Sequence, residues 1–273
     1  MSASRELVPL AAPVVDTHCH LEIAFGEDHV VAPVAQALAD ARAVGVTKII
    51  QVGCDVASSE WAAETAAEFP DVWATVALHP NAAAHDPNLE ASLAQIAQLA
   101  KLPQVRGIGE TGLDYYRTEE ALATAQHTSF RAHIDIARAN NKPVIIHDRD
   151  AHEDVIKTLL EYGAPDKVVF HCFSGDAEMA KICAENGWFM SFSGVVTFKN
   201  AENLRAALRV APDELILTET DSPFLTPAPM RGNPNSSVNL IHTVRAISQV
   251  RDAPEEEICN LLYANAARVF GPF

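Results

Sequence analysis

Histidines and carboxylates follow hydrophobic runs repeatedly in this sequence, and that recurrence constrains the fold more than any other feature. Six potential metal ligands stand at or just past the ends of five separate apolar runs: His18, His20, Glu110, His147, His171 and Asp221. An unpaired polar ring inside an apolar core costs several kcal/mol, so its recurrence needs a reason. Imidazole nitrogens and carboxylate oxygens bind divalent cations in catalytic sites. We therefore expect the run ends to meet around a common centre.

Short runs rich in apolar and β-branched residues recur at intervals typical of β-α units. There are eight: Val14–His18, Lys48–Gly53, Val72–Leu78, Val105–Gly109, Pro143–His147, Lys167–Phe173, Trp188–Ser193 and Leu215–Thr220. Helical spacing between them predicts helices at Pro33–Val44, Ser58–Phe69, Leu89–Leu102 and His127–Asn140. Gly45 directly follows the first of these helices, as a C-terminal cap would. Apolar runs that alternate with helices are typical of a parallel sheet.

Eight β-α units in about 260 residues predict an α/β protein with a closed (β/α)8 TIM barrel. An open doubly wound sheet is the alternative, but only a closed barrel makes the first and last strands neighbours, as the ligand positions require. We expect one barrel domain over residues 14–273, after an N-terminal tail of residues 1–13. Pro254–Phe270 is expected to form one or two extra C-terminal helices that cover the barrel.

Composition narrows the function classes. The 273-residue chain carries a formal net charge of −16, which argues against a broad basic nucleic-acid surface, although bound cations would add local positive charge. Its five cysteines show no C-x-x-C spacing, which favours a reduced, cytoplasmic protein. No apolar run resembles a secretory signal or approaches the roughly 18 residues that cross a membrane, so no membrane partner is expected. A monomer is compatible with the sequence, which does not fix the oligomeric state.

The first ligand pair is an H-x-H element at the end of the first run. Residues two apart on a strand lie on the same face, so His18 and His20 can both reach one ion. Cys19 between them then points away and is expected to pack in the core.

The remaining four ligands suit a second ion and a catalytic role. Glu110 follows glycines that permit close backbone approach, and its two oxygens can bridge two cations. His147 and His171 would each give the second ion one nitrogen, while Asp221 can bind the first ion and accept a proton from water. Two cations roughly 3.5–4 Å apart activate water and stabilise charge on a substrate oxygen. That chemistry suits phosphodiester, phosphomonoester, amide or lactone hydrolysis, and the ligands alone do not choose among them.

Several motifs resemble the signatures of the TatD family of metal-dependent deoxyribonucleases. They are His18-Cys19-His20-Leu21, Gly109-Glu110-Thr111-Gly112-Leu113-Asp114-Tyr115-Tyr116, Ile146-His147-Asp148-Arg149-Asp150-Ala151, His171-Cys172-Phe173-Ser174-Gly175 and Glu219-Thr220-Asp221-Ser222-Pro223-Phe224-Leu225. The resemblance runs in order from about residue 14 to Phe270. It implies an amidohydrolase-type TIM barrel, DNase activity (3′-to-5′ exonucleolytic in some members) and the same six metal ligands. We expect one or two divalent ions per chain, with Mg²⁺, Mn²⁺ and Zn²⁺ all compatible.

Two positions depart from the family pattern. Ala77 stands where the family usually has glycine, in Ala77-Leu78-His79-Pro80, and Ser237 stands where proline is usual. The ligands are intact, so these departures bear on substrate preference and not on metal binding.

Two arginines are candidate phosphate contacts. Arg149 lies two residues past His147 and would share its face, where it could bind a phosphate or form an ion pair that orients Glu110 or Asp221. Arg231 lies on a Pro/Gly-rich loop after the last run, as a phosphate contact or a solvated charge.

Other candidates surround the same centre. His79 ends the third run and could donate to substrate or cap the loop. Tyr115 or Tyr116 could stack on a base, with rim packing expected for at least one of them. Glu219 could orient a ligand or form a buried ion pair without a catalytic role.

The leading hypothesis is a deoxyribonuclease acting on DNA, on single strands or ends, with Asp221 and Glu110 as catalytic residues. One alternative is hydrolysis of a small ester, amide, lactone, phosphotriester or D-aminoacyl-tRNA. Many such barrels bridge their metals with a carboxylated lysine, and no lysine lies near Glu110. The other alternative is a non-catalytic metal-binding or interaction protein on the same barrel.

Overall fold

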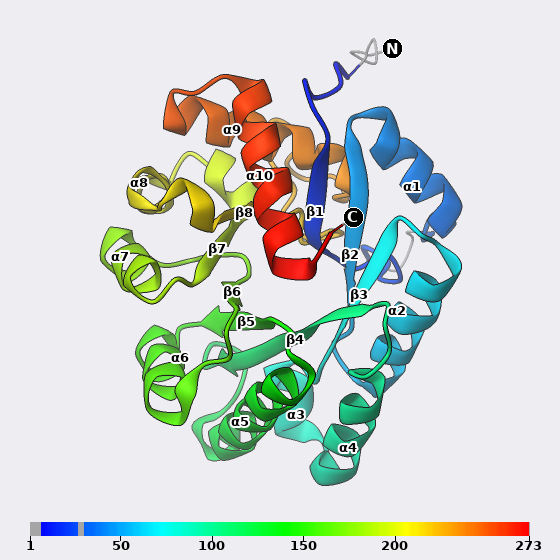
Figure 1. Cartoon of the computed structure of the whole chain (residues 1–273), viewed down its shortest axis with the longest axis vertical. Coiled ribbons are helices and arrows are strands. Elements are labelled where there is room, and N and C mark those ends of the chain that lie inside the picture. The colour runs from blue at the N-terminus through cyan, green and yellow to red at the C-terminus, as the bar shows by residue number, and fades with distance from the viewer. Residues whose placement is uncertain (1–6, 27–29, 273) are drawn as a thin grey trace.

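Eight parallel strands form a nearly closed barrel surrounded by helices, which confirms the predicted (β/α)8 fold (Figure 1). The computed structural model describes residues 7–26 and 30–272, so residues 1–6 of the predicted tail lie outside it. The strands are β1 (Val14–Cys19), β2 (Val46–Val52), β3 (Val72–Val76), β4 (Val105–Asp114), β5 (Val144–Arg149), β6 (Val168–Phe170), β7 (Phe189–Phe192) and β8 (Ile216–Thr218). Each pairs with the next in chain order.

Helices connect the strands on the outside of the barrel. They are α1 (Val34–Ala43), α2 (Val56–Glu68), α3 (Pro80–His85), α4 (Leu89–Leu99), α5 (Ala123–Asn140), α6 (His152–Thr158), α7 (Ala177–Glu185), α8 (Glu202–Val210), α9 (Leu240–Arg251) and α10 (Glu255–Phe270). The last turn of α6 continues as a π-helix, η2 (Leu159–Gly163). Gly45 follows α1 with φ +98°, as a C-terminal glycine cap requires. None of the described helices is long and apolar enough to cross a membrane.

The seam between β1 and β8 closes beyond the end of β8. The amide of Asp221 donates to the carbonyl of His18 at 2.9 Å, and the amide of His20 donates to the carbonyl of Ser222 at 2.8 Å. The first and last strands are therefore neighbours, and ligands from both ends of the chain share one rim.

A buried carboxylate reinforces this seam. Asp16 on β1 accepts hydrogen bonds from the Thr220 amide at 2.9 Å, the Thr220 hydroxyl at 2.6 Å and the Ser237 hydroxyl at 2.7 Å. Burial raises the pKa of Asp16 to about 6, although these hydrogen bonds act to lower it. Ser237, one of the two departures from the family pattern, thus supplies a donor that proline lacks. Ala77, the other departure, is fully buried beside Ser59, which bonds its amide and carbonyl.

Strand β4 is longer than predicted, because it continues through Glu110 to Asp114 instead of ending at Gly109. Its pairing with β5 shifts register between Ile108 and Thr111. A β-bulge of this kind re-aims side chains at a barrel rim. Gly109 permits the close approach, since a Cβ there would lie 2.5 Å from the side chain of Ile145.

Two runs that precede predicted ligands end earlier than expected. Strand β6 stops at Phe170 and β8 stops at Thr218, so His171 and Asp221 lie just past their strands. Cys172 and Asp221 adopt left-handed backbone angles, with φ of 42° and 52°. Residues with such angles cannot continue a β-strand, so the chain leaves the sheet at these positions.

Helix α10 covers the amino-terminal end of the barrel, opposite the ligands. The Asn265 side chain donates to the carbonyl of Ile216 at the start of β8, and Lys167, just before β6, donates to the carbonyl of Val269. The C-terminal segment forms one helix where one or two were expected. Part of the predicted tail is bound here too, because Leu10 is buried and the Ala11 amide donates to Glu255.

Removing the Ser237 hydroxyl should weaken the seam. Because it donates to a buried carboxylate, we expect Ser237→Ala to lower the free energy of unfolding by about 1.5–3 kcal/mol, measured by urea denaturation. Ser236→Ala is the matched control, since Ser236 is exposed, and should change stability by less than about 0.5 kcal/mol. Equal stability of the two variants would contradict the role assigned to Ser237.

Candidate metal centre

A cavity of about 560 Å³ opens at the carboxyl ends of the strands, where barrel enzymes place their sites. Five of the six predicted ligands line it: His20, Glu110, His147, His171 and Asp221. His18, the sixth, is completely buried next to them. The structure therefore brings all six side chains together.

Glu110 lies at the centre of the group. Its Oε2 lies 2.9 Å from His18 Nε2 and 3.1 Å from His171 Nε2. Its Oε1 lies 3.0 Å from His79 Nε2 and 3.8 Å from His147 Nδ1. The two oxygens thus face different sets of imidazoles, as a carboxylate that bridges two cations must.

Asp221 faces the ligands of the first strand. Its Oδ1 lies 3.5 Å from His20 Nε2 and 3.8 Å from His18 Nε2. The left-handed backbone at Asp221 and the hydrogen bond from its amide to the His18 carbonyl fix the side chain in this direction.

Unsatisfied buried atoms indicate that cations fit here. His18 Nε2 and Glu110 Oε2 are close, yet neither has a hydrogen-bond partner with acceptable geometry, and both are buried. Leaving such groups unpaired is costly, whereas a cation placed among them would satisfy both. Ligand atoms lie within 4.8 Å of one another in three overlapping sets: His18–His20–Glu110, His18–His171–Asp221 and Glu110–His147–His171. Their mixed nitrogen and oxygen donors suit Zn²⁺, Mn²⁺ or Mg²⁺.

Hydrogen bonds orient the imidazoles and fix which nitrogen faces the cavity. His171 Nδ1 donates to Glu219 Oε1 at 3.1 Å, so Nε2 is the nitrogen that faces Glu110. His20 Nδ1 donates to the carbonyl of Val52 at 3.2 Å, which turns Nε2 toward Asp221. Glu219 is therefore an orienting partner, one of the two roles expected for it.

Asp114 is an orienting residue that the sequence reasoning missed. Its Oδ2 lies 3.2 Å from His147 Nε2, so His147 turns Nδ1 toward Glu110. The Asn81 side chain also donates to this carboxylate, at 3.1 Å. The available signal was spacing, because Asp114 follows Glu110 by four residues in an extended segment and so shares its face. Asp114, His79 and His147 also lie close enough to bind one cation, but such binding would compete with the hydrogen bond that orients His147.

The imidazoles stabilise both central carboxylates in their charged forms. Burial alone would raise the pKa of Glu110, but His171 and His79 hold it well below its ordinary value. Burial likewise opposes ionisation of Asp221, while the hydrogen bond with His20 and the nearby His171 lower its pKa. Both carboxylates are thus anionic and available to cations at neutral pH.

Two of the four predicted substrate contacts lie at the cavity. Arg149 lines it at the end of β5 and stacks on the Tyr116 ring, 4.0 Å from its centroid. No ion pair joins Arg149 to Glu110 or Asp221 in the described part of the chain. His79 also lines the cavity, and its Nδ1 accepts from the Asn81 amide at 3.1 Å, so it caps α3 and faces the ligands at once. Arg117 lines the same cavity and was not anticipated.

The other two predicted contacts lie elsewhere. Tyr115 turns away from the ligands, and its hydroxyl donates to Asp154 at 2.7 Å, because Tyr115 is one residue past Asp114 and so faces the opposite side. The Arg231 guanidinium stacks on Phe198 at 3.9 Å and donates to the Thr226 carbonyl, so it does not line the cavity.

The sequence is similar to a family model and to known proteins over nearly its whole length. A family model described as "TatD related DNase" matches residues 15–271. The "Uncharacterized metal-dependent hydrolase TatD" of Mycobacterium tuberculosis is 40% identical over 263 residues, which cover 94% of this chain and 98% of the relative. The "Uncharacterized metal-dependent hydrolase YcfH" of Escherichia coli K12 is 36% identical over 258 residues, which cover 94% of this chain and 95% of the relative.

Solved structures agree on the fold. YJJV, a TatD homologue from Escherichia coli K12, superimposes with a TM-score of 0.85 at 25% identity, covering 94% of this chain and 97% of its own. A hydrolase TatD family protein from Entamoeba histolytica shows the same fold, with a TM-score of 0.84 at 19% identity. The match covers 98% of this chain and 100% of that protein.

Loss of the Glu219 acceptor should loosen His171 and weaken metal binding. We expect Glu219→Ala to lower zinc affinity about 10–100-fold, measured by competition with a chromophoric chelator. Glu219→Gln keeps an acceptor for His171 Nδ1 and should retain most of the affinity. Unchanged affinity in the alanine variant would contradict the orienting role.

The metal-free chain should lose stability as pH rises toward 9. Burial would lower the pKa of His171, but Glu110 and Glu219 outweigh it and raise this pKa to about 9. Because the folded pKa exceeds the ordinary value of 6.5, the stabilisation is complete below pH 6.5 and is lost as pH rises through 9. In chelator, we expect His171 to contribute a loss on the order of 2 kcal/mol by urea denaturation, so the total loss should be smaller in His171→Gln. Parallel curves for the two proteins would refute this.

Proposed function

This chain belongs to the TatD-related DNase family of metal-dependent hydrolases, and we propose that its reaction is the hydrolysis of phosphodiester bonds in DNA. The observation that carries the proposal is the position of Arg149, whose guanidinium lines the same cavity as the metal ligands. A planar guanidinium can bind two phosphate oxygens at once. A phosphate is the substrate group that both arginine and divalent cations bind well.

Arg149 is free to make this contact. It stacks on the exposed Tyr116 ring, and no carboxylate pairs with it among residues 7–26 and 30–272. Arg117 adds a second cation to the cavity lining. Together they offset part of the negative charge of the ligand carboxylates, which would otherwise repel a phosphate.

The chain's own groups can manage the protons of the reaction. Divalent cations bound by the six ligands would supply Lewis acidity and make water more acidic. Asp221 Oδ1 faces His20 and His18, so Oδ2 is left to take the proton of the attacking water. His79 accepts the Asn81 amide at Nδ1, so in its neutral form it carries its hydrogen on Nε2 and can donate to a phosphate oxygen. As the new P–O bond forms, the bond to the leaving oxygen breaks, and that oxygen takes a proton from solvent.

Exposed rings favour unpaired bases over duplex DNA. Phe224 lines the cavity and is 41% exposed, and Tyr116 beside Arg149 is 63% exposed. Stacking of a base on an aromatic ring contributes about 1–3 kcal/mol per base and needs the base to be unstacked from its neighbours. Single strands or strand ends therefore fit this proposal best.

The overall charge favours a second candidate, hydrolysis of a small ester, amide or lactone. A net charge of −16 repels polynucleotides at long range and leaves small substrates largely unaffected. Comparing rates on a chromogenic phosphodiester and a chromogenic carboxyl ester discriminates between the two functions.

Replacing Asp221 with asparagine should abolish cleavage. With Mg²⁺, Mn²⁺ or Zn²⁺ restored after chelation, we expect the wild-type chain to cut end-labelled single-stranded DNA. Asp221→Asn should be slower by about 10²–10⁴-fold, because the proton acceptor is lost. Metal affinity, measured separately, should fall only modestly.

Asp252→Asn is the matched control, because Asp252 is exposed and has the same left-handed backbone conformation, with φ 49° against 52° for Asp221. It should cleave at the wild-type rate. If no metal supports cleavage of DNA or of the chromogenic phosphodiester by the wild-type chain, the nuclease proposal fails. Undiminished cleavage by Asp221→Asn would instead remove the proton-accepting role from Asp221.

A further inference from the structure

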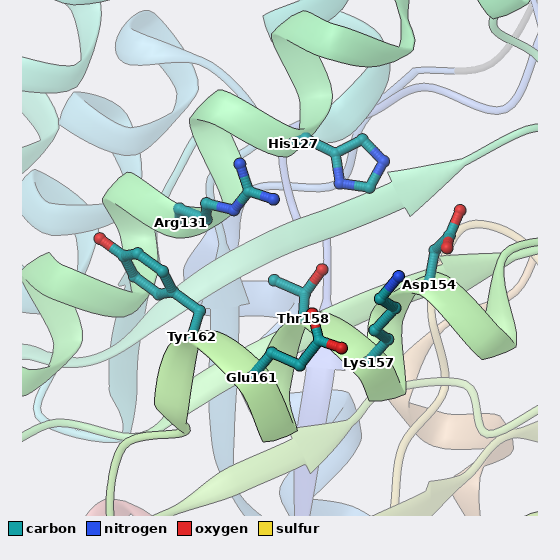
Figure 2. A pocket seen from close by; sticks show the side chains of 7 residues that line it. All are labelled: His127, Arg131, Asp154, Lys157, Thr158, Glu161 and Tyr162. Atoms are coloured by element: carbon teal, nitrogen blue, oxygen red, sulfur yellow. The ribbon is translucent and has the colours of Figure 1, made fainter.

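A second pocket lies on the outer wall of the barrel, between the helices that follow β4 and β5 (Figure 2). Its volume is about 280 Å³, just below the range of ligand pockets, about 300–1,000 Å³. Side chains of α5 and of α6 with η2 line it: His127, Arg131, Asp154, Lys157, Thr158, Glu161 and Tyr162. None of them takes part in the metal centre.

Two cations in this pocket have no partner. Neither Arg131 nor Lys157 forms an ion pair or hydrogen bond within the described parts of the chain. Nearby Arg138 differs, because it pairs with Asp135 and donates to the Tyr162 carbonyl. In a chain with 36 acidic and 20 basic residues, two unpaired cations facing one pocket indicate an anionic ligand.

The same pocket holds an unsatisfied acceptor. The Tyr115 hydroxyl donates to Asp154 at 2.7 Å, so it must accept from His127 Nε2, which lies 2.9 Å away. His127 then has its lone pair on Nδ1, and this atom is buried without a partner. Burial lowers the pKa of His127, which keeps the ring neutral at pH 7. A ligand that donates a hydrogen bond would satisfy Nδ1.

The carboxylates of Asp154 and Glu161 also line the pocket, so it is not a general anion site. Its cations require one negative group, while its carboxylates and His127 Nδ1 require donors from the same ligand. A nucleotide carries both, as a phosphate and as hydroxyl or base amino groups. Inorganic phosphate at neutral pH offers fewer donors and fits less well.

We propose that the α5–α6 pocket binds one nucleotide, with its phosphate between Arg131 and Lys157. The inference rests on the proposed function, because a nuclease offers two sources of this ligand, a released mononucleotide and a nucleotide of the bound strand. Tyr115 links the pocket to the metal centre: it bonds to His127 and Asp154, and directly follows Asp114, which orients His147.

The test compares two double variants with equal charge changes, each as the full, metal-loaded chain. Arg131→Gln with Lys157→Gln removes the pocket cations, and Lys181→Gln with Arg209→Gln removes two from α7 and α8. All four side chains are exposed, so both variants should fold. The probes are deoxyadenosine monophosphate, measured by calorimetry, and a non-hydrolysable phosphorothioate single strand, measured by fluorescence anisotropy.

We expect the pocket variant, but not the control, to bind one of these probes about 3–10-fold more weakly than wild type. If the strand is the source, the slope of log affinity against log salt should fall by about 0.7, for one lost phosphate contact. Weakening of the mononucleotide alone would assign the site to released product. Equal binding by both variants to both probes would overturn the proposal.

Hydrolysis of a chromogenic phosphodiester separates this inference from the proposed function. The pocket variant should hydrolyse it at the wild-type rate, because the pocket lies outside the metal cavity. A chain that binds nucleotides through the pocket but cleaves no phosphodiester would lose the proposed function and keep the site. A chain that cleaves the chromogenic substrate but binds neither probe would keep the function and lose the site.

Discussion

A carboxylate buried among imidazoles is stable only when charge of the opposite sign lies close to it, and Glu110 sets this condition for the whole rim. Its two oxygens contact four histidines that come from four different strand ends. Divalent cations placed among these atoms would replace the imidazole contacts with metal bonds and satisfy the unpaired Nε2 of His18. The chemistry at this rim and its electrostatic stability therefore depend on the same side chain.

The position of Glu110 depends in turn on the backbone around it. The register shift in β4 and the absence of a side chain at Gly109 bring this strand against β5 and aim the carboxylate inward. Across the rim, Asp16 ties the segment that carries Asp221 to β1. These two features lie on opposite sides of the site, and each sets the direction of one candidate ligand.

The sequence predicted the barrel and the convergence of the six candidate ligands because both leave local signals. Eight apolar runs mark the strands, and a histidine after an apolar run such as Val168-Val169-Phe170 is informative by itself. Asp114 and Tyr115 were harder, because their roles depend on where β4 ends and on how it bulges. The end of a strand is set by pairing with its neighbour, here Asp114 with Arg149, and no local pattern reports that pairing. The stacking of Arg231 on Phe198 likewise depends on a contact between two loops, which no local pattern reports.

The closure of the barrel across its first and last strands also orders events during synthesis. Glu110, His147 and His171 have all left the ribosome once residue 171 has emerged, so one set of ligand atoms is available early. His18 and His20 are made first of all, yet they meet Asp221 only after the eighth strand has been translated and has paired with the first. A chain truncated before residue 221 would therefore hold most of the candidate ligands and could not complete the site.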